Sequence, residues 1–168
     1  MSTTRPSPVS RRFLLAVFAA AFLAAVGLQW RSGAFSQELG GHPDEAAHYV
    51  TGLMLRDYGV ELLAGTAGSP MAFAKAYYEA RPKVAIGHYP PGFYLLEGLW
   101  LIPSRSESSA LLLQAALAAA LATAAAGFVG TAAGPMLGAV AAASVLALPW
   151  VRALLPLVMS DLLVALLA

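Results

Sequence analysis

Two polar segments hold most of the residues that could do chemistry. Residues 41–49, Gly-His-Pro-Asp-Glu-Ala-Ala-His-Tyr, contain the adjacent acids Asp44 and Glu45 and two histidines. Residues 88–94, His-Tyr-Pro-Pro-Gly-Phe-Tyr, contain a third histidine, two tyrosines and a diproline. Carboxylates and histidines at such spacing serve in general acid–base chemistry or hold a divalent cation. The surrounding helices and turns must therefore position these two segments.

The first segment has the pattern of a helix start. Pro43 suits the first helical position, where its missing N–H is not needed, and predicts a helix over residues 43–58. Asp44 and Glu45 then fall in the first turn, where free N–H groups and the helix dipole favour carboxylates. His48 follows Asp44 by four residues and shares its face. A helix-start role and a catalytic role both remain open for the two acids.

A carboxylate on this face could accept a proton from a hydroxyl group or hold that hydroxyl in place. The helix dipole keeps the acid ionised and so makes it a weak base. A weak base suffices when the leaving group is good, as a phosphate is, and when positioning supplies much of the rate. We therefore take Asp44 and Glu45 as the candidate catalytic residues.

Metal binding is an alternative use of the same residues. Asp44, Glu45 and one histidine could hold a single Mg²⁺ or Mn²⁺ ion, because oxygen ligands suit these ions. Glu45 and His48 also have the Glu-x-x-His spacing of di-iron bundles, but the chain has no second copy of it. Zinc-protease, nucleotide-binding and serine-hydrolase motifs are absent from the sequence.

Composition predicts an all-helical, polytopic membrane protein. Of the residues, 59% are hydrophobic and 11% charged, and the mean hydropathy is +0.69, whereas about a quarter of a soluble domain is charged. The net charge of +1 comes from scattered residues, which argues against nucleic-acid binding. There is no cysteine, so disulfides and thiolate metal sites are excluded.

Residues 1–12 are expected to form a cytoplasmic tail and residues 13–30 the first transmembrane helix. The apolar stretch has about 18 residues, close to the roughly 20 that a span needs. A cleaved signal peptide is the alternative, but the stretch is longer than usual and closes with the interfacial residues Trp30 and Arg31. Two arginines precede it, so we expect the N-terminus inside and residues 31–88 as an extracytoplasmic loop.

Residues 89–168 are expected to contain transmembrane helices two to five. The predicted spans cover residues 89–103, 110–129 and 136–150, with the last beginning at residue 154. The first of these is short, and a re-entrant helix is its alternative. Because the chain stops inside an apolar run, we expect it to be the N-terminal portion of a longer protein. In the loop, a second short helix is predicted over residues 71–80, after a turn at residues 65–70.

The second polar segment has a structural and a functional interpretation. Pro90 and Pro91 favour an extended entry to the next helix, and the aromatic residues around them could form a belt at the interface. Alternatively, this corner presents His88 and Tyr89 toward the acids, so both are candidate substrate-binding residues together with His48. Lys83, in the same loop, could attract a phosphate group.

The order of these features resembles the beginning of the GT-C glycosyltransferases, especially the protein O-mannosyltransferase, aminoarabinose transferase and rhizobial lipopolysaccharide glycosyltransferase group. The shared features are an N-terminal apolar helix, an outer loop opening with Asp44-Glu45, a Pro-Pro-Gly-Phe-Tyr-Leu-Leu entry, Ala/Leu-rich helices and an acid after Met159-Ser160. The aminoarabinose branch has a lysine before its diproline, where this chain has Tyr89, which argues against that branch.

The resemblance implies an enzyme of the bacterial plasma membrane that transfers a sugar from a polyprenyl-phosphate donor. The acceptor would be a lipid, glycan or protein on the extracytoplasmic side. It also implies that Asp44 is the base or acceptor-positioning group, with Glu45 beside it. One alternative is a transporter or channel fragment using Glu97 and Asp161, since acids are costly within lipid. Another is an inactive, truncated membrane protein.

Overall fold

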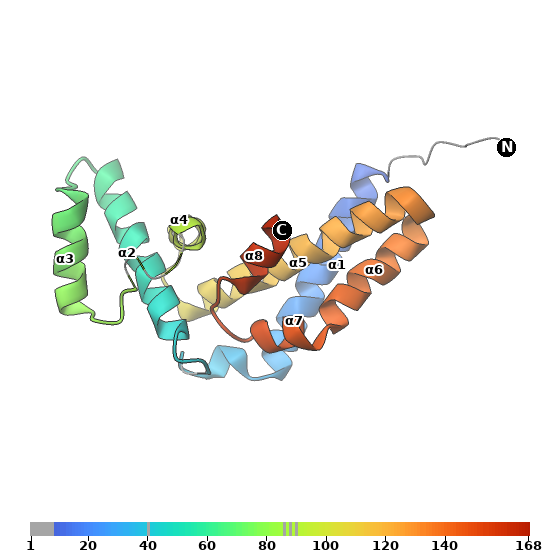
Figure 1. Cartoon of the computed structure of the whole chain (residues 1–168), viewed down its shortest axis with the longest axis horizontal. Helices are drawn as coiled ribbons and strands as arrows, with labels where there is room; N and C mark the ends of the chain where they lie inside the picture. Colours follow the sequence, from blue (N-terminus) through green and yellow to red (C-terminus); the bar gives the residue numbers. More distant parts are fainter. Residues whose placement is uncertain (1–8, 40, 86, 88, 90) are drawn as a thin grey trace. The chain divides into compact units, whose positions relative to one another are not determined.

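The computed structural model describes residues 9–39, 41–85, 87, 89 and 91–168, and all regular structure in them is helical (Figure 1). The chain forms two compact units, each described here by itself. Unit 1 comprises residues 1–34, 114–156 and 161–168, and unit 2 comprises residues 35–113 and 157–160. The all-helical class expected from the composition is confirmed for the described residues.

Unit 1 contains the most apolar helices. These are α1 (Arg11–Arg31), most of α5 (Glu107–Ala133), α6 (Pro135–Ala147), α7 (Pro149–Leu154) and α8 (Asp161–Leu167). Among the described helices, α1 with 21 residues and α5 with 27 are long and apolar enough to cross a membrane. The Ser10 hydroxyl caps α1 by accepting the Phe13 N–H at 3.2 Å. Two helices of this kind are weak support for a membrane location.

Small residues pack the helices of unit 1 closely. Five alanines from α1, α5 and α6 form its core: Ala21, Ala119, Ala122, Ala126 and Ala142. Between α5 and α6, Gly134 turns the chain at φ +95°. A Cβ on Gly138 would lie 2.6 Å from the Ala126 carbonyl oxygen and 3.0 Å from the Gly130 Cα. Backbone therefore meets backbone, as the Ala-rich sequence predicts for tightly packed membrane helices.

The expected five spans are not confirmed, since two of the described helices are long and apolar enough to cross a membrane. Residues 136–150, expected as one span, form α6 and α7, because Pro149 keeps Leu148 in an extended conformation, with ψ 128°. Helix α4 (Pro91–Trp100) has 10 residues, a length of about 15 Å at 1.5 Å per residue. That is about half of the hydrocarbon core, so residues 89–103 do not form a complete helical span.

The described part of unit 2 contains α2, α3, α4 and the first turns of α5, with the short turn η1 (Ala34–Ser36) at its start. Helix α2 (Glu45–Leu63) begins two residues later than predicted and continues past Gly59 to Leu63. Helix α3 (Pro70–Ala80) agrees with the prediction to within one residue. In Figure 1, α3 runs beside α2, and α4 is seen nearly end-on where it crosses α2.

The crossing of α2 and α4 is close because both helices contribute glycine. A Cβ on Gly98 would lie 3.1 Å from the backbone nitrogen of Arg56 and 3.3 Å from the Gly52 carbonyl oxygen. At Gly52, an added Cβ would lie 2.3 Å from a carboxyl oxygen of Glu97. This contact fixes the two helices against each other and brings the start of α2 close to the chain that enters α4.

Candidate functional site

Asp44 stands immediately before α2, and its carboxylate is held on one oxygen. The side chain makes no capping bond to the helix. Instead, its Oδ2 accepts a hydrogen bond of 2.8 Å from the Tyr89 hydroxyl. The side chain is 44% exposed, and the ring of His42 lies 4.0 Å away. Asp44 thus presents an oriented carboxylate that solvent, or a substrate, can reach.

His48 joins the same two segments one turn further along α2. Its Nδ1 lies 3.1 Å from the Tyr94 hydroxyl. Its ring centroid is 4.7 Å from that of Tyr89 and 5.7 Å from that of Phe93. His48 is 1% exposed, so it is buried although it was expected on the same helix face as Asp44. The histidine supports the aromatic residues behind Asp44 from within the core.

The environment of Tyr94 keeps its hydroxyl protonated. Burial, and then the nearby Tyr89, Glu97 and Asp44 groups, raise the pKa of Tyr94 above its usual range. Burial and the charge of Asp57 raise the pKa of Tyr77 on α3 in the same direction. At neutral pH both hydroxyls therefore remain available as hydrogen-bond donors.

Glu45 is placed differently from its neighbour. It is 3% exposed, and each carboxylate oxygen accepts a backbone N–H. Oε2 accepts from Gly41 at 3.1 Å, and Oε1 accepts from Val158 at 3.0 Å. Glu45 consequently ties residues 157–160 to the start of α2 and does not face solvent beside Asp44.

The other predicted substrate-binding residues have separate positions. Lys83 is exposed and forms no ion pair with any residue that the structure describes. His88 lies outside the described residues. Tyr89 is the predicted residue that the structure brings into direct contact with an acid, through its bond to Asp44.

The described residues contain no group of three or more histidine, aspartate and glutamate side chains that could hold a metal ion. Each oxygen of Glu45 accepts one backbone N–H. The Mg²⁺ or Mn²⁺ site expected from Asp44, Glu45 and one histidine stays a prediction.

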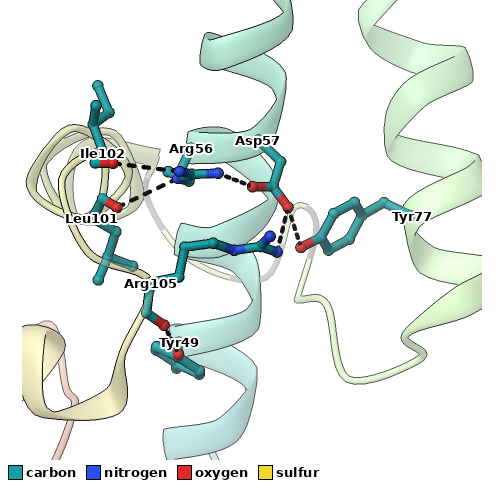
Figure 2. A network of polar contacts seen from close by, with 7 residues as sticks. All are labelled: Tyr49, Arg56, Asp57, Tyr77, Leu101, Ile102 and Arg105. Carbon is teal, nitrogen blue, oxygen red and sulfur yellow. Dashed lines mark hydrogen bonds and ion pairs between the residues drawn. The ribbon is translucent and has the colours of Figure 1, made fainter.

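A second polar network, which sequence reasoning missed, lies between α2, α3 and the end of α4 (Figure 2). The Asp57 carboxylate accepts hydrogen bonds from Arg56 at 2.8 Å, Arg105 at 3.0 Å and Tyr77 at 3.2 Å. The Arg105 carbonyl oxygen accepts the Tyr49 hydroxyl. A consecutive Arg-Asp pair inside an otherwise apolar helical pattern was the signal that could have pointed to this network.

Arg56 also closes the C-terminal end of α4. Its Nε donates to the Leu101 carbonyl at 3.4 Å, and an Nη donates to the Ile102 carbonyl at 3.3 Å. These two carbonyls belong to the residues that follow α4, and Figure 2 shows the guanidinium group of Arg56 reaching them from α2. The network thereby stabilises the end of the chain segment that carries Tyr89 at its beginning.

The two acids expected within spans have different surroundings. Glu97 on α4 is fully buried against Gly52, and its carboxyl oxygens have no hydrogen-bond partner among the described residues. Burial raises the pKa of Glu97 well above its ordinary value. Burial thus disfavours the charged form of this carboxyl group. Asp161, in unit 1, is half-buried and occupies the first turn of α8.

Comparisons of the chain with protein-family models, with curated proteins and with solved structures give no match.

Proposed function

We propose that the chain belongs to a membrane glycosyltransferase, in which Asp44 orients the acceptor hydroxyl and takes its proton. The observation that carries this proposal is the 2.8 Å bond from the Tyr89 hydroxyl to the Asp44 carboxylate. It joins the two polar segments whose order along the chain resembles the GT-C enzymes. The donor would be a polyprenyl-phosphate sugar, and the acceptor a hydroxyl group of a lipid, glycan or protein.

The proposed reaction needs few groups from the protein. The acceptor oxygen forms a bond to the anomeric carbon, and the bond from that carbon to the phosphate oxygen breaks. Polyprenyl phosphate leaves with the electron pair, and the acceptor proton passes to Asp44. Because phosphate is a good leaving group, a weak base held in the correct position is sufficient.

The geometry supports different roles for the two acids, with Asp44 contacting the acceptor and Glu45 holding the start of α2. Tyr89 occupies one oxygen of Asp44, and the structure records no hydrogen bond from a described residue to the other oxygen. That second oxygen can meet an acceptor hydroxyl, since the side chain is 44% exposed. Glu45 keeps the first turn of α2 in place through its two backbone bonds.

The membrane part of the proposal rests on α1 and α5. Both have the length and apolar composition of membrane-crossing helices. A donor with a polyprenyl chain remains in the bilayer, so an enzyme that uses it must work at the membrane surface. The segment containing Asp44 follows α1 directly along the chain and precedes α5, which suits that location.

The test is sugar transfer by membranes that contain the full-length protein. Membranes would be incubated with radiolabelled polyprenyl-phosphate hexoses and pentoses, and label would be followed into lipid, glycan and protein. Asp44→Asn should lower transfer by about 100-fold or more, the usual loss for an acid–base group. Glu38→Gln, at an exposed acid of the same loop, should leave it unchanged.

Two results would overturn the proposal. One is transfer at the wild-type rate by Asp44→Asn. The other is no transfer from any polyprenyl-phosphate sugar, together with solute flux in proteoliposomes that depends on Glu97 and Asp161. The second result would favour the transporter alternative.

A further inference from the structure

An apolar groove lies between α2, α3 and α4 of unit 2, on residues that the proposed reaction does not use. Its volume is about 560 Å³, within the range of about 300–1,000 Å³ typical of small-molecule sites. The lining is almost wholly apolar, with Arg56 as its charged member. Representative lining residues, two from each helix, are Met54, Leu62, Met71, Phe73, Leu95 and Leu99.

Large apolar side chains at the rim of the groove are exposed. Met71 is 77% exposed, Leu99 67% and Leu95 56%. Three large apolar side chains around one apolar depression form the kind of patch that marks an interaction site. The partner must therefore itself present an apolar surface.

The position of unit 2 along the chain indicates that lipid is the apolar partner. Along the chain, residues 35–106 lie between α1 and α5, the two described helices long and apolar enough to cross a membrane. Three residues separate Arg31, the end of α1, from Phe35, where unit 2 begins, and the first residues of α5 belong to unit 2. Unit 2 is thus joined at both ends to a helix of membrane-crossing length, and lipid is the apolar partner that such a connection brings near.

The arginine side chains beside the groove favour lipids with an anionic headgroup. Arg56 lines the groove and shares Asp57 with Arg105. Glu61 borders Arg56 and Asp57, and Arg81 lies over the ring of Tyr77, so these five charged side chains carry one more cation than anions. Figure 2 shows the guanidinium groups of Arg56 and Arg105 converging on the single Asp57 carboxylate. The Arg105 side chain is 51% exposed, so its charge is available to an outside group. An anionic headgroup complements this excess charge, whereas a zwitterionic headgroup does so less well.

We propose that this groove binds one acyl chain of an anionic phospholipid, with the phosphate at the Arg56–Asp57–Arg105 cluster. The chain would displace water from the apolar lining, and the headgroup would meet the exposed Arg105 guanidinium. This site is separate from Asp44 and does not depend on the proposed transferase activity. A bound lipid would fix α3 and α4 against α2, and hence the segment that carries Tyr89.

The full-length protein, purified in detergent, tests the inference by native mass spectrometry. Phosphatidylglycerol and phosphatidylcholine with identical acyl chains would be added separately, and the lipid-bound fraction measured. Phosphatidylglycerol should bind more tightly. Ala74→Trp, which fills the groove, should weaken that binding about tenfold, or about 1.4 kcal/mol. Ala72→Trp is the matched control, because Ala72 is exposed on the same helix and does not line the groove.

A charge variant tests the headgroup. Arg105→Gln should lower phosphatidylglycerol binding about fivefold, as expected for a loss of about 1 kcal/mol per cationic side chain. Arg105→Lys should retain most of the binding. If Ala74→Trp loses its helical circular dichroism, Leu99→Gln at the exposed rim replaces it, with the same expected direction.

Three outcomes would contradict the inference. Equal binding of the two lipids would exclude headgroup selection by the arginines. Wild-type binding by Ala74→Trp and Leu99→Gln would place the acyl chain elsewhere. Complete displacement of phosphatidylglycerol by an equimolar isoprenyl phosphate would make an isoprenoid lipid, and not a phospholipid, the occupant.

Discussion

The start and the middle of α2 each meet a side chain from residues 89–97, and the two contacts differ in their access to solvent. At the start, Asp44 accepts the Tyr89 hydroxyl and remains 44% exposed. In the middle, Glu97 lies against Gly52 with 0% exposure and no hydrogen-bond partner among the described residues. Both sites contain a carboxyl group, but only the first can meet a substrate.

The difference shows that a carboxyl group in an apolar sequence is not by itself a sign of chemistry. Burial, with no hydrogen-bond partner among the described residues, raises the pKa of Glu97 and disfavours its charged form. Glu97 fills the space that Gly52 leaves and so contributes to helix packing. Asp44 has one oxygen bonded to Tyr89 and no recorded hydrogen bond from a described residue to the other, and its 44% exposure leaves it within reach of solvent.

The largest expected effect is a loss of stability caused by a substitution in the middle of α2. Gly52→Ala should destabilise the protein by on the order of 3 kcal/mol, because the new Cβ would overlap Glu97 and force α2 and α4 apart. Its distances from Glu97 would be 2.3 Å to Oε2 and 2.7 Å to Cγ. Thermal unfolding of the full-length protein in detergent, followed by circular dichroism, measures the loss.

Gly59→Ala on the same helix is the matched control, since nothing lies within 4 Å of a Cβ there. It should be neutral or stabilising by up to about 1 kcal/mol, because alanine favours the helix over glycine. Adding Glu97→Ala to Gly52→Ala should restore part of the lost stability. Equal midpoints for the two glycine variants would show that the Gly52–Glu97 contact is not close.

A second prediction concerns pH. Because the pKa of Glu97 is higher in the folded than in the unfolded chain, the folded state binds this proton more tightly. That contribution to stability is complete below about pH 4.3, the ordinary glutamic acid pKa. It is lost as the pH rises from there to the raised pKa of the folded state.

Glu97→Gln mimics the protonated acid and should remove this dependence. The variant and the wild type should unfold at similar temperatures near pH 4. The wild type should become less stable than the variant as the pH rises, by about 1.4 kcal/mol for each pH unit between the unfolded and the folded pKa, because folding then requires the carboxyl group to take up a proton. Unfolding midpoints at pH 4, 6 and 8 test this, and parallel curves for the two proteins would show that Glu97 does not titrate differently on folding.

The smallest expected effect is a loss of sugar transfer caused by a substitution next to the start of α2. Tyr89→Phe removes the hydroxyl that holds Asp44 and should lower sugar transfer about tenfold, equivalent to about 1.4 kcal/mol. The unfolding temperature should change little, because Asp44 is half exposed and water can replace the bond. Tyr78→Phe, at an exposed tyrosine of α3, should have no effect on transfer. Equal rates for the two variants would separate Tyr89 from the proposed chemistry.

Local pattern was enough to predict several helices. Continuous apolar runs indicated α1 and α5, and proline and glycine indicated the bounds of α3. Pro149 is also a local signal that α6 ends before residue 150, whereas hydropathy alone predicts one helix over residues 136–150. These features depend on neighbours along the chain, which a sequence displays directly.

The roles of individual acids depended on distant residues and were harder to predict. The sequence places Glu45 beside Asp44 as a candidate catalytic acid, yet its partner Val158 lies 113 residues away. The local sequence does not identify the partners of Asp57, because Tyr77 and Arg105 come from other elements. By contrast, the expected approach of residues 88–94 to the acids is seen at Tyr89.

The most direct measurement compares Asp44→Asn with Glu45→Gln for both sugar transfer and thermal unfolding. Asp44→Asn should abolish transfer with an unchanged unfolding midpoint. Glu45→Gln should lower the midpoint, by about 1–3 kcal/mol of stability, because an amide cannot accept both backbone N–H groups. Retained transfer in a correctly folded Asp44→Asn protein would contradict the account.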